Sequence, residues 1–163
     1  MNSRIATIAL CLIAHPLALG AAEPALYTTW AGGMEPDKCA TAWLLTRRVS
    51  PGARFKFFPR GKKIAEGTTF EVPFAKLTRA GNLSGFECAL AAHKLDEPAL
   101  LEMGRIMHDI EINTWQPKAT AEAAGLTAVI RGLARTSKDD HEVLERSFVV
   151  LDALHAELAA RYK

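Results

Sequence analysis

The chain has 163 residues, with 20 lysines and arginines against 18 aspartates and glutamates, and a formal net charge of +2 at pH 7. A balance this close to neutral argues against a nucleic-acid partner, which would require a strongly basic surface. The length suits one globular domain with its own hydrophobic core.

The first 22 residues are typical of a secretory signal peptide. Arg4 precedes an apolar run from Ile5 to Leu19, and small residues follow it, which is the order that export signals require. The run is shorter than the roughly 20 residues of a spanning helix, and Pro16 interrupts it. We therefore predict cleavage after Ala22, a periplasmic or secreted location, and no stable membrane insertion after cleavage. Residues 23–163 are predicted to form a single domain.

The remaining sequence predicts strands near its start and helices after them. Alternating or extended segments at 27–30 and 54–59 indicate strands, with a helix at 36–48 between them, and two short strands are expected at 70–74 and 75–78. Further helices are predicted at 84–93, after the cap Asp96 through the buried stripe from Leu100 to Ile110 and on to Glu111, at 119–135, and from the cap Asp139 to about Arg161. Capping residues are expected at Ser84, Asp96 and Asp139. The predicted fold class is α+β, predominantly helical, with a small N-terminal β-sheet packed with about five helices.

Two clusters of imidazole and carboxylate side chains are candidates for a metal site. His108, Asp109 and Glu111 lie at the end of the third predicted helix, and Asp140 and His141 lie at the start of the last. Side chains spaced i, i+3 or i, i+4 lie on neighbouring helix faces, so each cluster could supply two ligands. Mixed nitrogen and oxygen ligands suit zinc, iron, manganese or nickel. We therefore predict a divalent transition metal as cofactor.

Several of these residues also have a purely structural interpretation. His108 could be a hydrogen-bonded boundary residue, Asp109 a solvated one and Asp140 a helix cap. Asp140 projects onto the apolar face of its helix, where an ionised carboxylate is rarely left without a partner. We expect it to meet a cation, a basic side chain or backbone donors.

Basic residues in and after the first predicted helix form a second candidate site. Lys38, Arg47 and Arg54 could bind a small oxyanion, because guanidinium groups fit tetrahedral oxyanions well. The alternative is a solvated, salt-bridged surface.

The order of several sequence blocks resembles a known family. The blocks are 35–40 (EPDKCA), 42–47, 51–55, 106–112, 123–126, 139–141 and 152–154, and the resemblance as a whole extends from about residue 30 to residue 158. They resemble the chromate-resistance family, whose domain forms the C-terminus of ChrB-type proteins and occurs alone in exported homologues. The resemblance implies a sensor or accessory factor rather than a transporter. The positions that it carries over are Asp37, Trp43, Arg47, His108, Asp109, Asp140 and His141, and it adds Asp37 to the candidate metal ligands.

The chain departs from many of these relatives where they carry cysteines. Thr41 and Ala42 stand where the relatives have a Cys-Pro pair, and Ser84 stands where they have a Cys. Thiol-based handling of chromium is therefore not expected here. Cys39 and Cys88 lie close to the positions of the relatives' cysteines but do not coincide with them, and the sequence leaves open whether they form a disulfide or stay apart.

Three functions are compatible with these patterns. The first is an exported accessory or sensor protein of the chromate-resistance type that binds a metal ion or a small oxyanion. The second is a metal-dependent hydrolase or oxidoreductase with Glu145 or Asp109 as general base. The third is an interaction module without metal, whose acids pair with Arg47, Arg105 and Arg131. The sequence does not decide whether the protein is an enzyme.

Overall fold

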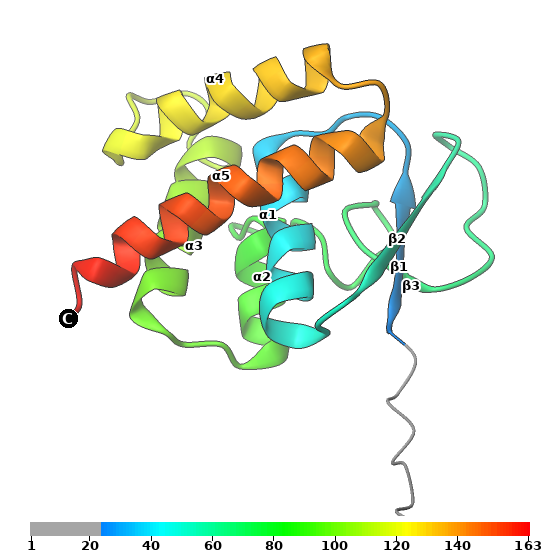
Figure 1. Cartoon of the computed structure of the whole chain (residues 1–163), viewed down its shortest axis with the longest axis horizontal. Coiled ribbons are helices and arrows are strands. Elements are labelled where there is room, and N and C mark those ends of the chain that lie inside the picture. Colours follow the sequence, from blue (N-terminus) through cyan, green and yellow to red (C-terminus); the bar gives the residue numbers. More distant parts are fainter. Residues whose placement is uncertain (1–23) are drawn as a thin grey trace, which may run out of the picture.

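A computed structural model describes residues 24–163, and the predicted signal peptide lies outside them. Within residues 24–163 a small sheet lies at one side of the molecule, and five α-helices make up most of the remaining body (Figure 1). The elements in chain order are β1 (Leu26–Trp30), α1 (Pro36–Leu44), a π-helical turn (Leu45–Val49), β2 (Arg54–Phe58), β3 (Thr68–Thr69), α2 (Gly85–His93), α3 (Pro98–Glu111), α4 (Ala121–Thr136) and α5 (Asp140–Ala160). The predicted α+β, mainly helical class is confirmed.

The sheet has three parallel strands in the order β2-β1-β3. Residues Leu26 to Trp30 of β1 pair in register with Arg54 to Phe58 of β2, and α1 provides the crossover that two parallel neighbours require. The two short strands predicted at 70–74 and 75–78 are wrong. The third strand is Thr68–Thr69, and the following segment forms only a single bridge between Phe70 and Leu77.

Local caps explain where two of the helices begin. The Ser84 hydroxyl accepts a hydrogen bond from the Glu87 N–H at 3.2 Å, and the Glu87 carboxylate accepts one from the Ser84 N–H at 2.8 Å. This reciprocal pair is the predicted capping box, and it satisfies two donors at the start of α2. Asp139 likewise caps α5 by accepting the Glu142 N–H at 2.9 Å.

The predicted cap of α3 is wrong. Glu97 occupies the N-cap position instead of Asp96, and its side chain makes no capping hydrogen bond. Pro98 follows in the first turn, where a missing N–H has no cost.

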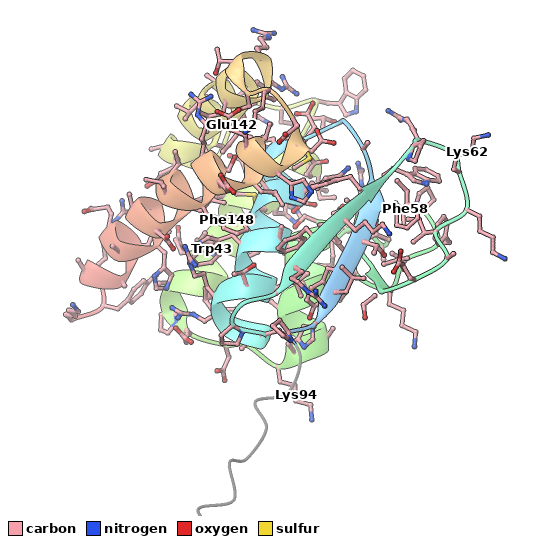
Figure 2. All side chains as sticks on the ribbon, turned by 45° about the vertical axis from the view of Figure 1, so that its right-hand side comes forward. Trp43, Phe58, Lys62, Lys94, Glu142 and Phe148 are labelled. Carbon is pink, nitrogen blue, oxygen red and sulfur yellow. The ribbon has the colours of Figure 1, made fainter. Side chains whose placement is uncertain are left out.

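Helix α1 lies at the centre of the fold and contacts α2, α3, α4 and α5. Trp43 on α1, labelled in Figure 2, is 1% exposed, and its ring centroid lies 5.5 Å from that of His155 on α5. The helix continues past Leu44 as the π-helical turn, so the single helix predicted to residue 48 changes its hydrogen bonding there. None of the helices within residues 24–163 is both long and apolar enough to cross a membrane.

Candidate functional site

The structure separates the predicted site residues into three places. Asp37, Lys38 and Glu111 line one cavity of about 400 Å³, and His108 and Asp109 line another of about 810 Å³. Asp140 and His141 lie at the start of α5 and line neither of these two cavities. The first cavity, called the acid cavity below, is lined by Trp30, Ala31, Gly32, Gly33, Glu35, Asp37, Lys38, Arg60, Glu71, Pro73, Arg79 and Glu111.

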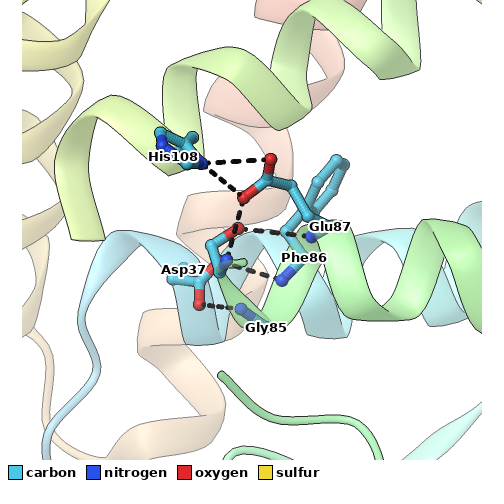
Figure 3. A network of polar contacts seen from close by, with 6 residues as sticks. Asp37, Gly85, Phe86, Glu87 and His108 are labelled. Atoms are coloured by element: carbon cyan, nitrogen blue, oxygen red, sulfur yellow. Dashed lines mark hydrogen bonds and ion pairs between the residues drawn. The ribbon is translucent and has the colours of Figure 1, made fainter. Parts of the chain in front are cut away.

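Asp37 joins α1 to the first turn of α2. Its carboxylate accepts the N–H groups of Gly85 at 2.7 Å and Phe86 at 3.0 Å, and its side chain is almost fully buried. A carboxylate at this place compensates the positive end of the helix and satisfies two of its unpaired donors. Figure 3 shows Asp37 and His108 approaching the same turn of α2 from two other helices.

Glu71 is a site residue that the sequence patterns did not reveal. Its backbone adopts a φ of +48°, a left-handed conformation that is uncommon for a residue other than glycine. A Cβ atom at Gly85 would lie 1.7 Å from Glu71 Oε1, so the glycine leaves room for this carboxylate against the first turn of α2. The Thr41 hydroxyl donates a hydrogen bond to Glu71 Oε1 at 3.2 Å. The sequence feature that could have pointed to Glu71 is its place as a single acid between two apolar residues, Phe70 and Val72, both of which are buried.

Asp37, which is buried, and Glu71, which is half-buried, therefore meet at the start of α2 as a pair of acids. Burial raises the pKa of Asp37 to about 6, against the backbone hydrogen bonds that lower it and with the help of nearby Glu111 and Glu87. Burial and then the charge of Asp37 raise the pKa of Glu71 to about 8. Two carboxyl groups this close to each other resist simultaneous ionisation. The pair is expected to retain a proton at neutral pH.

Three cationic side chains line the same cavity: Lys38, Arg60 and Arg79. The Lys38 ammonium donates to the backbone oxygens of Trp30 at 3.2 Å and Gly32 at 3.1 Å, and burial lowers its pKa. Arg60 and Arg79 are exposed. Of the three predicted oxyanion ligands, only Lys38 lines this cavity.

Thr41 and Ser84 also belong to this region. These are the two positions at which the resemblance places cysteines in relatives. Thr41 contacts Glu71, which lies against Gly85, the residue next to Ser84. Positions 43 residues apart in the sequence thus reach the same turn of α2.

His108 pairs with Glu87 rather than with the other predicted metal ligands. Its Nδ1 atom lies 3.0 and 3.2 Å from the two carboxylate oxygens of Glu87, the residue that also caps α2. His108 is thus the hydrogen-bonded boundary residue that the structural interpretation expected.

Asp109 holds the segment that follows α3. Its carboxylate accepts hydrogen bonds from the Asn113 amide at 2.7 Å and from the N–H and hydroxyl of Thr120, each at 2.9 Å. Burial favours a raised pKa, but hydrogen bonds from Thr120, Ala119 and Asn113 outweigh it and hold the pKa of Asp109 well below its usual range. The prediction that Asp109 is solvated is wrong, because the chain folds back over it.

Asp140 and His141 have separate local roles. Asp140 accepts the Gly32 N–H at 2.7 Å, which confirms the predicted backbone donor and fixes the loop after β1. The exposed His141 ring lies 4.8 Å from the Phe57 ring, and it lines a shallow hollow with Arg54 and Glu145.

Arg47 is occupied by an ion pair with α5. Its guanidinium donates to both carboxylate oxygens of Asp152, at 2.9 and 2.7 Å, and the Trp43 indole N–H donates to the same carboxylate at 2.8 Å. Arg105 and Arg131 also form ion pairs, with Glu102 and Glu35, and neither partner is one of the candidate metal ligands. Arg47 therefore joins two helices rather than lining an anion site.

No group of three or more His, Cys, Asp or Glu side chains that could hold a metal ion is found within residues 24–163. The expected convergence of His108, Glu111, Asp140 and His141 on one ion would require a different arrangement of the helices. The metal itself stays a prediction. Cys39 is buried, Cys88 is partly exposed, and both are free thiols in this structure.

Comparison with known proteins gives two matches. The family model described as "ChrB, C-terminal domain" matches residues 27–158. The chain is also similar to a protein of Cupriavidus metallidurans (strain ATCC 43123 / DSM 2839 / NBRC 102507 / CH34) described as "Protein ChrB". The two are 29% identical over 129 residues, which cover 78% of this chain and 39% of that protein. The chain thus spans well under half the length of this curated relative. No solved structure matches it.

Proposed function

Because this chain belongs to the family of ChrB C-terminal domains, we propose that it is an exported accessory or sensor protein of chromate resistance that binds a small oxyanion in the acid cavity. The observation that carries the proposal is that three cationic side chains line one cavity with Glu71, a carboxyl group whose pKa burial raises to about 8. The predicted signal at residues 1–22 supports export, and binding requires no turnover.

Three cationic side chains of the cavity suit a tetrahedral oxyanion, and they also balance the Glu35, Asp37 and Glu111 carboxylates of its lining. Lys38, Arg60 and Arg79 supply positive charge from three separate segments. The raised pKa of Glu71, about 8, keeps this carboxyl group protonated at pH 7, so that it can donate a hydrogen bond to an anion instead of repelling it. Arg60 and Arg79 are exposed and are free to close over a bound ion.

Titration calorimetry with chromate, and with sulfate as a tetrahedral analogue, tests the proposal on the folded protein at pH 7. We expect Arg60→Gln and Arg79→Gln each to weaken binding about fivefold to tenfold, because a hydrogen bond to a charged group contributes about 1.5–3 kcal/mol and these two are exposed. Binding should also weaken as salt is added.

Lys62→Gln and Lys94→Gln are matched controls, since both lysines are exposed and line none of the cavities described above. Their removal lowers the total charge equally without touching the site. The proposal would be refuted if neither ion gave a heat of binding. It would also be refuted if the Arg and Lys variants lost affinity equally.

A further inference from the structure

Positive charge is concentrated in one segment of the chain, which begins with β2 and ends before α2. Of the 20 lysines and arginines, seven lie in residues 54–79, which contain two of the 18 aspartates and glutamates. The remaining residues together carry more acids than bases. A local excess of this kind attracts an anionic surface even when the whole protein is nearly neutral, because salt screens the more distant charges.

Strand β2 turns part of this charge away from the helices. The rings of Phe55 and Phe57 lie 6.3 and 4.8 Å from rings of α5. Side chains alternate between the two faces of a strand, so Lys56 and Phe58 lie on the face that points away from α5. The Lys56 ammonium lies 5.3 Å from the centre of the Phe58 ring. Figure 2 shows Phe58 and Lys62 at the side of the molecule formed by the sheet.

Aromatic side chains lie among these cations. Trp30 pairs in register with Phe58 on the neighbouring strand, and its ring centroid lies 5.8 Å from that of Phe74. The Trp30 indole N–H donates to the Lys62 backbone oxygen at 2.9 Å. Trp30 thereby holds the basic loop after β2 beside Phe74, which is 59% exposed.

The lysines of this loop are free to meet an external partner. Lys62 and Lys63 are exposed, and neither forms an ion pair within residues 24–163. Lys56 differs, since it pairs with Glu66. The loop and its aromatic neighbours form a surface that we call the basic patch, and its members are Lys56, Phe58, Arg60, Lys62, Lys63 and Phe74.

From this arrangement we infer that the basic patch docks the protein on an anionic phospholipid surface. Lys62 and Lys63 contact the headgroup phosphates, and the exposed ring of Phe74 lies at the boundary between headgroups and acyl chains. Such docking is peripheral and draws on the negative surface potential of the lipid. It goes beyond the proposed function, because it concerns the surface that holds the protein rather than the ion in the acid cavity.

The aromatic side chains favour lipid over a single-stranded nucleic acid. A nucleic-acid strand stacks successive bases on several exposed rings, whereas Trp30 and Phe58 are half-buried and only Phe74 of these three rings is exposed. A lipid surface needs one exposed ring beside flexible cations, and Phe74 with Lys62 and Lys63 meets this requirement.

Co-sedimentation with lipid vesicles tests the inference. The predicted signal would itself bind lipid, so the test uses residues 23–163, which contain the whole described fold and its hydrophobic core. We expect binding to vesicles made of equal parts phosphatidylglycerol and phosphatidylcholine, and at least tenfold weaker binding to vesicles of phosphatidylcholine alone. Added salt should weaken the binding.

Substitutions at exposed positions separate the patch from total charge. We expect Lys62→Gln and Lys63→Gln each to lower the partition coefficient about fivefold, and Phe74→Ala to lower it several-fold. Lys94→Gln and Lys138→Gln remove the same charge elsewhere, and Lys94 lies far from Lys62 in Figure 2. These two controls should bind as the parent does, and circular dichroism reports whether each variant is folded.

Four results would overturn the inference. They are no binding to phosphatidylglycerol vesicles, equal binding to phosphatidylcholine vesicles, equal losses in the Lys62 and Lys94 variants, and tighter binding of a single-stranded oligonucleotide than of vesicles. Arg60 lines the acid cavity as well, so it is left unchanged in every variant. Failure of docking therefore leaves the oxyanion proposal standing, and failure of oxyanion binding leaves docking standing.

Discussion

Replacing Glu71 by glutamine is expected to stabilise the protein above pH 8 and to flatten the pH dependence of its unfolding free energy. The pKa of Glu71 is raised from its ordinary 4.5 to about 8 in the folded protein. Between these pH values the folded state holds a proton that the unfolded state has released. The contribution of protonated Glu71 to the free energy of unfolding is therefore fully present below about pH 4.5 and is lost as the pH rises through 8.

Glutamine has nearly the shape of the protonated acid and can still accept the Thr41 hydrogen bond, but it cannot ionise. Water can reach this carboxylate from the cavity, so we expect a difference on the order of 2 kcal/mol between the variant and the parent at high pH. Urea unfolding at a series of pH values measures it. Glu157→Gln, at an exposed position of α5, is the control and should leave the profile unchanged. Parallel profiles for Glu71→Gln and the parent protein would contradict the prediction.

Replacing Asp37 by alanine is expected to lower the free energy of unfolding by about 2–3 kcal/mol. The substitution leaves the N–H groups of Gly85 and Phe86 without their acceptor, and each unpaired buried donor costs about 1–3 kcal/mol. Removing the Asp37 charge also lowers the pKa of Glu71, and this change offsets part of the lost stability.

Asp139→Ala provides the matched comparison, because Asp139 caps α5 at an exposed position. Loss of an ordinary N-cap costs about 1 kcal/mol. Denaturant unfolding at pH 7 measures both variants. A loss in Asp37→Ala no greater than that in Asp139→Ala would show that the buried position adds nothing to a simple cap.

Local sequence signals predicted most of the helices because their causes lie within a few residues. The capping pairs at Ser84 and Asp139 act over three residues, and both were confirmed. The prediction of the short strands was wrong for a related reason. A two-residue strand such as Thr68–Thr69 depends on its neighbour β1, and no periodic pattern can develop over so few positions.

The candidate site was predicted less well, since it depends on packing between helices. Helical spacing places His108 near Glu111 along one helix, yet the two side chains line different cavities. His108 instead meets Glu87, 21 residues earlier. The expected metal cluster assumed that α3 and α5 present their acids and imidazoles to each other, whereas Asp140 binds the loop after β1.

The sequence by itself determined the fold class, the order of the helices and the need of Asp140 for a partner, and the resemblance of its sequence blocks indicated the family. The fold class, the helix order and the need of Asp140 follow from periodicity, capping residues and charge, all of which act locally or are shared along the whole chain. Only the tertiary structure brought Asp37, Glu71 and the first turn of α2 together and separated His108 from His141. The reason is that a buried carboxyl pair arises where three segments meet, and the pKa shifts that distinguish it come from burial and proximity, which no linear pattern records.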